Sequence, residues 1–315
     1  MITRITTRIP LLLICLICSA ANSANNADNW GKEIKTKAEF YASSDVSKFQ
    51  VDLTRKWYEV GAKAWGNYGP LEFWIVGHDV KAAEQLDKQY CHLRKQKDPE
   101  VDTNSCENRG HNFVTYAMNG NAGLNTRRGK HENWSGFIVT MSGKNPGPQE
   151  EDYLTVVLHE YFHVYQQAHV FSKDHKERDS KNQPNPWWIE GGAEYMAQLL
   201  YSRQPDVSPN HLRIKMGQKL RSITNLDEGE SIRDIPYGKR GHIAYDLGAW
   251  FIAYLIHETS EEAFRVKFFK SLNKKGFEDA FIHSFGESSD VFLRRFHNEF
   301  LPLAKEDKLN ILPQE

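Results

Sequence analysis

The sequence predicts an α+β protein in which a small mixed sheet with helices is followed by a mostly helical half. Short apolar runs bounded by Gly, Pro or Asn occur before residue 143 and are typical of β-strands. From Glu150 onward the apolar residues recur at helical spacing. The turn-forming stretch GKNPGPQ, residues 143–149, separates the two patterns. We therefore expect an α/β subdomain over 25–149 and a helical subdomain over 150–315.

Residues 1–24 have the pattern of a secretory signal peptide. Arg4 and Arg8 precede the apolar run IPLLLICLICSA, which is too short to cross a bilayer, and small residues follow at 19–21. The pattern predicts an exported protein, periplasmic or secreted, with no stable membrane span after cleavage. A short membrane anchor is the alternative.

Removal of that segment leaves two of the four cysteines, Cys91 and Cys106. In an exported chain, two cysteines fifteen positions apart favour one disulfide across a polar loop. Closing a loop of that length stabilises the fold by about 3 kcal/mol in the chain-entropy model. Two buried thiols are the alternative, and the lack of a C-x-x-C pair argues against a cysteine zinc site.

The N-terminal half contains helical and strand-like segments. Residues 36–65 are expected to be mainly helical, and Gly66 can end that helix. Its apolar face at spacings of three and four consists of Phe49, Leu53, Trp57, Val60 and Ala64. Strands are expected at 71–77, 111–118 and 134–142, a polar helix or loop at 80–96, and a loop at 119–130. In the C-terminal half, helices are expected at 151–170, 188–203, 243–257, 261–274 and 288–304.

Composition excludes some classes of function. The chain of 315 residues is 40% hydrophobic and 26% charged, which is typical of a folded globular protein. A formal net charge of −1 predicts no strong attraction to nucleic acid or to anionic lipid. The loop 119–130 has no G-x-G-x-x-G motif, so a nucleotide site is not expected either. The sequence makes no prediction of oligomeric state.

The stretch HEYFH, residues 159–163, has the spacing of a zinc-hydrolase motif. On a helix, His159 and His163 share a face and can present two imidazole nitrogens to one metal ion. Glu160 lies about 100° around the helix, where it can reach a water molecule whose pKa the metal lowers to about 7. It would then act as general base. The alternative is a core helix whose histidines bond to backbone, because a chain with 13 histidines can produce this pattern by chance.

A second acidic motif favours the metal site. The stretch PWWIEGGAEYMAQLL, residues 186–200, places Glu190 and Glu194 four positions apart on the next helix. One carboxylate can complete a His-His-Glu site while the other orients a ligating imidazole from behind. The alternative is an acidic helix start, which is favourable in any helix.

Together, HEYFH and WWIEGGAEY resemble the gluzincin zinc metallopeptidases, in particular the peptidase MA-like group related to aminopeptidase N and thermolysin. The resemblance implies a zincin-like helical half with the active site at the junction of the two halves. It implies that His159, His163 and Glu190 bind one zinc ion per chain, with Glu160 as general base. Glu194 falls where the family places an acidic residue bonded to a zinc histidine.

A later segment, HIAYDLGAWFIAYL over 242–255, is similar to the Y-x-x-G-A segment of aminopeptidase-N-like proteins. That similarity implies that the Tyr245 phenol donates a hydrogen bond to the developing oxyanion. His242 is a weaker candidate for the same role, and a core tyrosine is the alternative. The spacing departs from the family pattern, because 26 residues separate His163 from Glu190, more than in aminopeptidase N. Neither the G-x-M-E-N motif nor an obvious free-amine anchor is present, so aminopeptidase activity is not implied.

We therefore expect an exported zinc-dependent metallopeptidase that acts on a peptide or protein substrate. A secreted binding or scaffold protein with the same fold is one alternative, and a zinc hydrolase of a non-peptide bond is another. A binding protein has no need of Glu160, which favours the enzyme.

Overall fold

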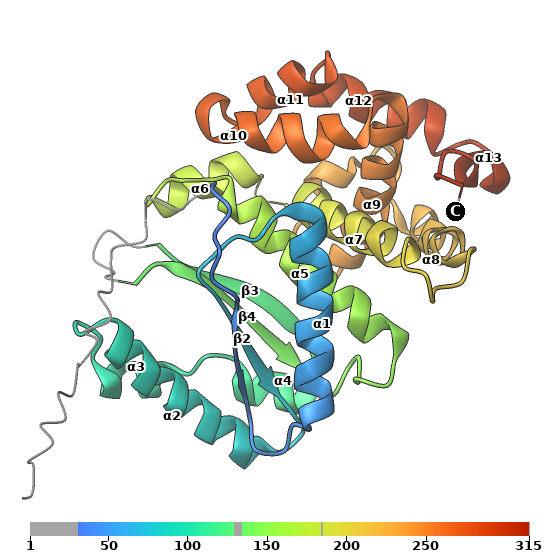
Figure 1. Cartoon of the computed structure of the whole chain (residues 1–315). Coiled ribbons are helices and arrows are strands. Elements are labelled where there is room, and N and C mark those ends of the chain that lie inside the picture. Colours follow the sequence, from blue (N-terminus) through green and yellow to red (C-terminus); the bar gives the residue numbers. More distant parts are fainter. Residues whose placement is uncertain (1–30, 129–133, 184, 315) are drawn as a thin grey trace, which may run out of the picture.

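The computed structural model describes residues 31–128, 134–183 and 185–314. A small sheet with its helices forms one part of the molecule, and a bundle of helices forms the other (Figure 1). The predicted α+β class, with a small mixed sheet and mostly helical content, is confirmed. The expected signal peptide, residues 1–24, lies outside the described residues.

The sheet has the strand order β1-β2-β4-β3. Strands β1 (Glu39–Ala42), β2 (Leu71–Val76) and β4 (Gly136–Ser142) are parallel, and β3 (Ala122–Arg127) pairs antiparallel with β4. Every residue of β2 and β4 is buried, as expected for central strands covered on both faces. Strand β3 is therefore an edge strand of this sheet.

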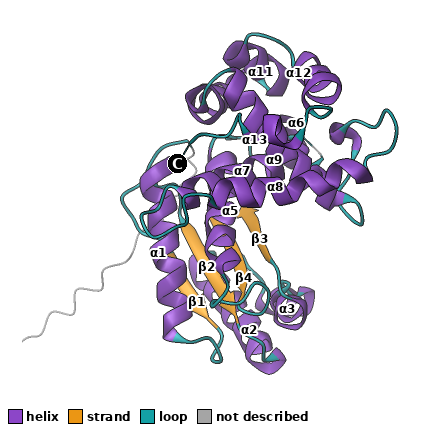
Figure 2. Ribbon diagram, turned by 90° about the vertical axis from the view of Figure 1, so that its right-hand side faces the viewer, coloured by secondary structure: helices purple, strands orange, loops and turns teal. Residues whose placement is uncertain are grey.

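Helices cover both faces of the sheet (Figure 2). Successive side chains of β2 point to opposite faces of the sheet. Phe73 points to the face that packs against α1 (Lys48–Trp65) and α5 (Glu151–Ala168). Its neighbour Trp74 points to the other face. That second face is covered by α2 (Val80–Lys97), α3 (Thr103–Arg109) and α4 (Phe113–Asn119).

The predicted disulfide joins Cys91 in α2 to Cys106 in α3. Both cysteines are buried in the smaller core, on the sheet face away from α5. The bridge thus ties two helices together at a distance from the histidine motif.

One strand prediction and one loop prediction in the N-terminal half are wrong. The segment predicted as a strand at 111–118 forms helix α4, in which Phe113 and Ala117 lie four apart and share the buried face. The predicted loop at 119–130 contains strand β3, whose residues are mostly half-buried. Strand β3 is held by pairing along β4, and such pairing leaves no apolar run in the sequence. Strand β1 was also missed, within the segment predicted as mainly helical.

The predicted apolar face of α1 is right in the middle and wrong at its ends. Trp57 is buried, and Leu53 and Val60 pack against the core. Phe49 is 54% exposed and Ala64 is also exposed. The buried face instead carries Gln50 and Thr54 beside its aromatic residues. The Thr54 hydroxyl lies 2.7 Å from the Tyr153 hydroxyl of α5, so a polar contact between helices takes the place of an apolar one.

The C-terminal half is helical, as predicted. Its elements are α5, α6 (His175–Asn182), α7 (Pro186–Ser202), α8 (His211–Lys219), η2 (Leu220–Asn225), η3 (Ile232–Asp234), α9 (Gly241–Glu258), η4 (Ala263–Phe268), α10 (Phe269–Lys275), α11 (Phe277–Phe285), α12 (Ser289–Arg295), η5 (Phe296–Phe300) and α13 (Lys305–Leu309). The expected helices correspond to α5, α7, α9, η4 with α10, and α12 with η5. Helices α6, α8 and α11 were not predicted. In the described part of the chain, no helix is long and apolar enough to cross a membrane.

Helices α7 and α9 touch backbone to backbone at two glycines. A Cβ atom added to Gly191 would lie 2.3 Å from the carbonyl carbon of Gly248, and one added to Gly248 would lie 2.3 Å from the carbonyl oxygen of Trp187. Only glycine permits so close an approach. Glu190 precedes the first glycine and Tyr245 lies three residues before the second, so the crossing brings these side chains to one place.

Candidate functional site

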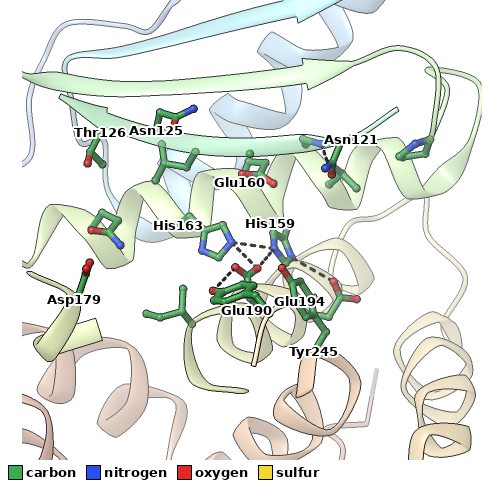
Figure 3. A pocket seen from close by; sticks show the side chains of 18 of the residues that line it. Asn121, Asn125, Thr126, His159, Glu160, His163, Asp179, Glu190, Glu194 and Tyr245 are labelled. Carbon is green, nitrogen blue, oxygen red and sulfur yellow. Dashed lines mark hydrogen bonds and ion pairs between the residues drawn. The ribbon is translucent and has the colours of Figure 1, made fainter. Parts of the chain in front are cut away.

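The histidine motif lies on α5 and the acidic motif on α7, and the two meet in one cluster (Figure 3). The Nε2 atoms of His159 and His163 are 3.0 Å apart. Oε2 of Glu190 lies 3.2 Å from the first and 3.0 Å from the second. The helical spacing therefore brings both imidazoles to one carboxylate oxygen.

These three atoms have the spacing that a zinc ion requires. Tetrahedral ligands at about 2.0–2.1 Å from zinc are about 3.3 Å from one another, close to the separations found here. Two imidazole nitrogens and one carboxylate oxygen are also the donor set of catalytic zinc sites that keep a fourth position open. The residues thus fit a zinc ion in both chemistry and spacing.

Gln166 fixes the orientation of His163. The Nδ1–H group of His163 donates to Oε1 of Gln166 at 2.7 Å, and Nε2 of Gln166 donates to the Ile189 carbonyl at 2.9 Å. With its proton on Nδ1, the imidazole presents the Nε2 lone pair toward Glu190. Sequence reasoning missed Gln166, although its position three residues after His163 on the same helix was a usable signal.

Glu194 lies behind His159. The family resemblance predicts an acidic residue at this place, bonded to a zinc-binding histidine. Its Oε2 is 3.3 Å from Nδ1 of His159, on the far side of the ring from the donor cluster. Its other oxygen accepts from Lys219 at 2.9 Å and from Gln198 at 3.2 Å. Lys219 comes from α8, and no pattern in the sequence pointed to it.

The charged groups of the cluster shift one another's pKa values strongly. Burial alone would lower the pKa of His159, but hydrogen bonds to Glu190 and Glu194, together with the charges of Glu190 and Glu160, raise it to about 10. Burial would likewise raise the pKa of Glu190, but the charge of His163 and bonds to both histidines hold that pKa well below its usual value. The concentrated negative charge that favours protons on the imidazoles also favours a bound cation.

Glu160 is not part of the donor set. Its side chain is 6% exposed and lines the same pocket as the two histidines. Its Oε2 atom has no hydrogen-bond partner among the described residues. Burial raises the pKa of Glu160, although the charges of the two histidines oppose the shift. A buried carboxylate whose Oε2 atom has no partner in the described part of the chain, facing a polar pocket, is placed to exchange a proton there.

Two phenols flank the cluster. Tyr245 of α9 lines the pocket, and its ring is parallel to that of His159 with centroids 6.4 Å apart. Burial, followed by the charge of Glu190, raises the Tyr245 pKa. Tyr237, in the loop before α9, donates from its hydroxyl to Oε1 of Glu190 at 2.9 Å. Sequence reasoning missed Tyr237.

His242 does not share this pocket. It is exposed and lines a smaller neighbouring cavity together with Lys219 and Asp246. The structure therefore places Tyr245 nearer to the donor cluster than the weaker candidate for the same role.

The pocket itself has a volume of about 650 Å³ and lies between the edge strand β3 and the helices α5, α6 and α7. Much of its wall is polar; these residues are Asn121, Asn125, Thr126, Asn145, Gln167, Arg178 and Asp179. The site is thus a candidate metal centre in an open, hydrophilic pocket beside a strand.

Two imidazoles, a carboxylate and a separate glutamate around one pocket define the class as a candidate metal-dependent hydrolase. Residues 152–237 match the model of a protein family described as M61 glycyl aminopeptidase. M61 is a zinc metallopeptidase family of the gluzincin type, so the predicted resemblance to gluzincin metallopeptidases is confirmed over this segment. The narrower relation to aminopeptidase N and thermolysin stays a prediction. Neither the curated proteins nor the solved structures contain a match to the chain.

Proposed function

We propose that the protein is an exported, zinc-dependent metallopeptidase that hydrolyses peptide bonds in the pocket between β3 and α5. One observation carries the proposal: Nε2 of His159, Nε2 of His163 and Oε2 of Glu190 converge within 3.2 Å of one another while Glu160 lines the same pocket. The match of residues 152–237 to a metallopeptidase family supports it.

His159, His163 and Glu190 would hold the zinc ion. When bound, zinc supplies a Lewis acid that polarises a carbonyl group and lowers the pKa of a water molecule. Glu160 accepts the proton of the attacking water and then donates it to the departing amine. The Tyr245 hydroxyl donates a hydrogen bond to the oxygen on which negative charge develops.

Strand β3 supports a peptide as the substrate. It is hydrogen-bonded to β4 on one side, and its residues from Ala122 to Thr126 line the pocket. An extended peptide can add to such an edge through main-chain hydrogen bonds. The scissile bond of a peptide held there would lie between the strand and the donor cluster on α5.

The matching family model is described as a glycyl aminopeptidase. We extend peptide-bond hydrolysis to this chain but not the aminopeptidase specificity, because the G-x-M-E-N motif of aminopeptidase-N-like enzymes is missing from the sequence.

A peptide library tests the proposed activity. The zinc-loaded chain lacking residues 1–24 is incubated with the library, and products are identified by mass spectrometry. We expect cleavage that a chelator abolishes and that added zinc restores. Cleavage that persists in the presence of the chelator, or a zinc-loaded protein that cleaves no peptide, would contradict the proposal.

A further inference from the structure

Lys219 is connected to the candidate metal ligand His159 through the carboxylate of Glu194. Its Nζ atom is 2.9 Å from Oε1 of Glu194, whose Oε2 is 3.3 Å from Nδ1 of His159. The three groups form a chain that runs from α8 through α7 to α5. Figure 3 shows the inner part of this chain, from Glu194 to the two histidines.

Lys219 is itself held from a second side. Its Nζ atom lies 3.1 Å from Oδ1 of Asp246, and Oδ2 of Asp246 accepts from the Ser222 hydroxyl at 2.6 Å. The lysine side chain is 17% exposed. It is the last residue of α8, where the helix dipole favours a positive charge. One ammonium group therefore links α7, α8 and α9.

The contact between Lys219 and Glu194 affects the orientation of His159. An acceptor at Nδ1 keeps the imidazole proton on that nitrogen and leaves the Nε2 lone pair for a metal. Glu194 can serve as that acceptor only if its side chain is held in place. Its other oxygen accepts from Lys219 at 2.9 Å and, at the longer distance of 3.2 Å, from Gln198.

We propose that Lys219 is a positioning residue of the metal site, which acts through Glu194 to hold His159 in its ligating orientation. This inference rests on the proposed function, since it requires that His159 binds zinc. It goes further by assigning a role to a residue that touches neither the donor atoms nor Glu160.

The same helix supplies a matched control. Lys215 lies one turn before Lys219 and has a similar exposure, 19%. It also faces two carboxylates, with its Nζ atom 2.5 Å from Asp152 and 3.7 Å from Glu151. Lys215→Met therefore removes the same ammonium group from the same helix without removing the partner of Glu194.

The readout is the zinc dissociation constant, measured by competition with a chelating dye. We expect Lys219→Met to weaken zinc binding by about 10–100-fold, the usual effect of losing a group that orients a ligand. Lys215→Met should change it by less than about two-fold, as for a surface substitution. Lys219→Arg should recover most of the affinity. If Lys219→Met does not fold, Lys219→Gln replaces it with the same expected direction.

A double-mutant cycle separates this role from general stability. If Lys219 acts through Glu194, then Lys219→Met should cost little zinc affinity in a Glu194→Gln background. Additive losses would overturn the inference. So would normal zinc affinity in Lys219→Met with a raised KM, because Lys219 would then contact substrate.

Failure of the inference and failure of the proposed function give different results. If the wild-type chain binds no zinc, both the proposed function and the role of Lys219 are overturned. If the wild type binds zinc and Glu194→Gln weakens it while Lys219→Met does not, only the role of Lys219 is overturned.

Discussion

At the scale of single residues, Glu160 separates a hydrolase from a protein that merely binds metal. We predict that Glu160→Gln lowers kcat by about 10²–10⁴-fold, the contribution of a general base, and leaves zinc bound. The substitution keeps the shape of a side chain that is outside the donor set. Rates on a peptide found in the library and zinc content of the same sample measure both quantities. A variant with near-normal turnover would remove Glu160 from the mechanism.

Tyr245 and Tyr237 are the two candidates for the phenol that stabilises the oxyanion. We predict that Tyr245→Phe lowers kcat and kcat/KM together by about 10²–10³-fold, the effect of losing one oxyanion donor. Zinc content and thermal stability should barely change, because the ring still packs beside His159. Steady-state kinetics on both phenylalanine variants give the comparison.

Three outcomes would assign that role differently. A larger loss in Tyr237→Phe would point to Tyr237, whose hydroxyl donates to Oε1 of Glu190 at 2.9 Å. A large loss in His242→Ala, with Tyr245→Phe unaffected, would move it to that histidine. An unchanged rate with lower stability in Tyr245→Phe would make Tyr245 a core residue.

At the scale of helices and strands, the crossing of α7 and α9 sets the distance between Glu190 and Tyr245. We predict that Gly191→Ala destabilises the fold by about 1–3 kcal/mol or more, because its Cβ would meet the backbone of Gly248 at 2.3 Å. Urea unfolding measures the change, and zinc affinity should fall with it. Backbone atoms cannot move aside as a side chain can.

Gly217→Ala is the matched control. Gly217 is also inside a helix, α8, but the nearest atom to its added Cβ would be 3.7 Å away. Alanine there should stabilise the fold by about 0.5–1 kcal/mol through helix propensity. Equal effects of the two substitutions would contradict the account of the crossing.

The same elements show how far the sequence predicts the structure. Helices α5, α7 and α9 were predicted because their apolar spacing is regular. The i, i+4 rule paired His159 with His163, and the family resemblance selected Glu190 as the third ligand. Strand β3 was missed because its pairing with β4, not its own composition, makes it a strand. Lys219 and Tyr237 reach the site from elements distant in sequence, and such contacts leave no local pattern.

At the scale of the whole molecule, the disulfide and the candidate metal site lie on opposite faces of the sheet. We predict that replacing Cys91 and Cys106 with alanine lowers the free energy of unfolding by about 3 kcal/mol, as expected for this loop length. Zinc affinity should be unchanged, because the bridge lies on the sheet face away from α5. Urea unfolding and dye competition on the same samples make the comparison. A large loss of zinc affinity would mean that the sheet transmits strain to the site.

Material taken from the natural export route tests localisation as well. Mass spectrometry of the non-reduced protein should show an N-terminus near residues 21–25 and Cys91 joined to Cys106. Two freely alkylated thiols in exported protein, or an intact N-terminal segment, would count against export with oxidation.

The most direct test of the central claim is the metal content of the purified chain lacking residues 1–24. Elemental analysis after zinc loading and removal of excess metal should give one zinc per chain, because three donors converge at a single point. The double variant His159→Ala/His163→Ala should lose that zinc, while Glu160→Gln should retain it. Stoichiometric zinc that persists in the double variant, or its absence from the wild type, would contradict the assignment of the metal centre.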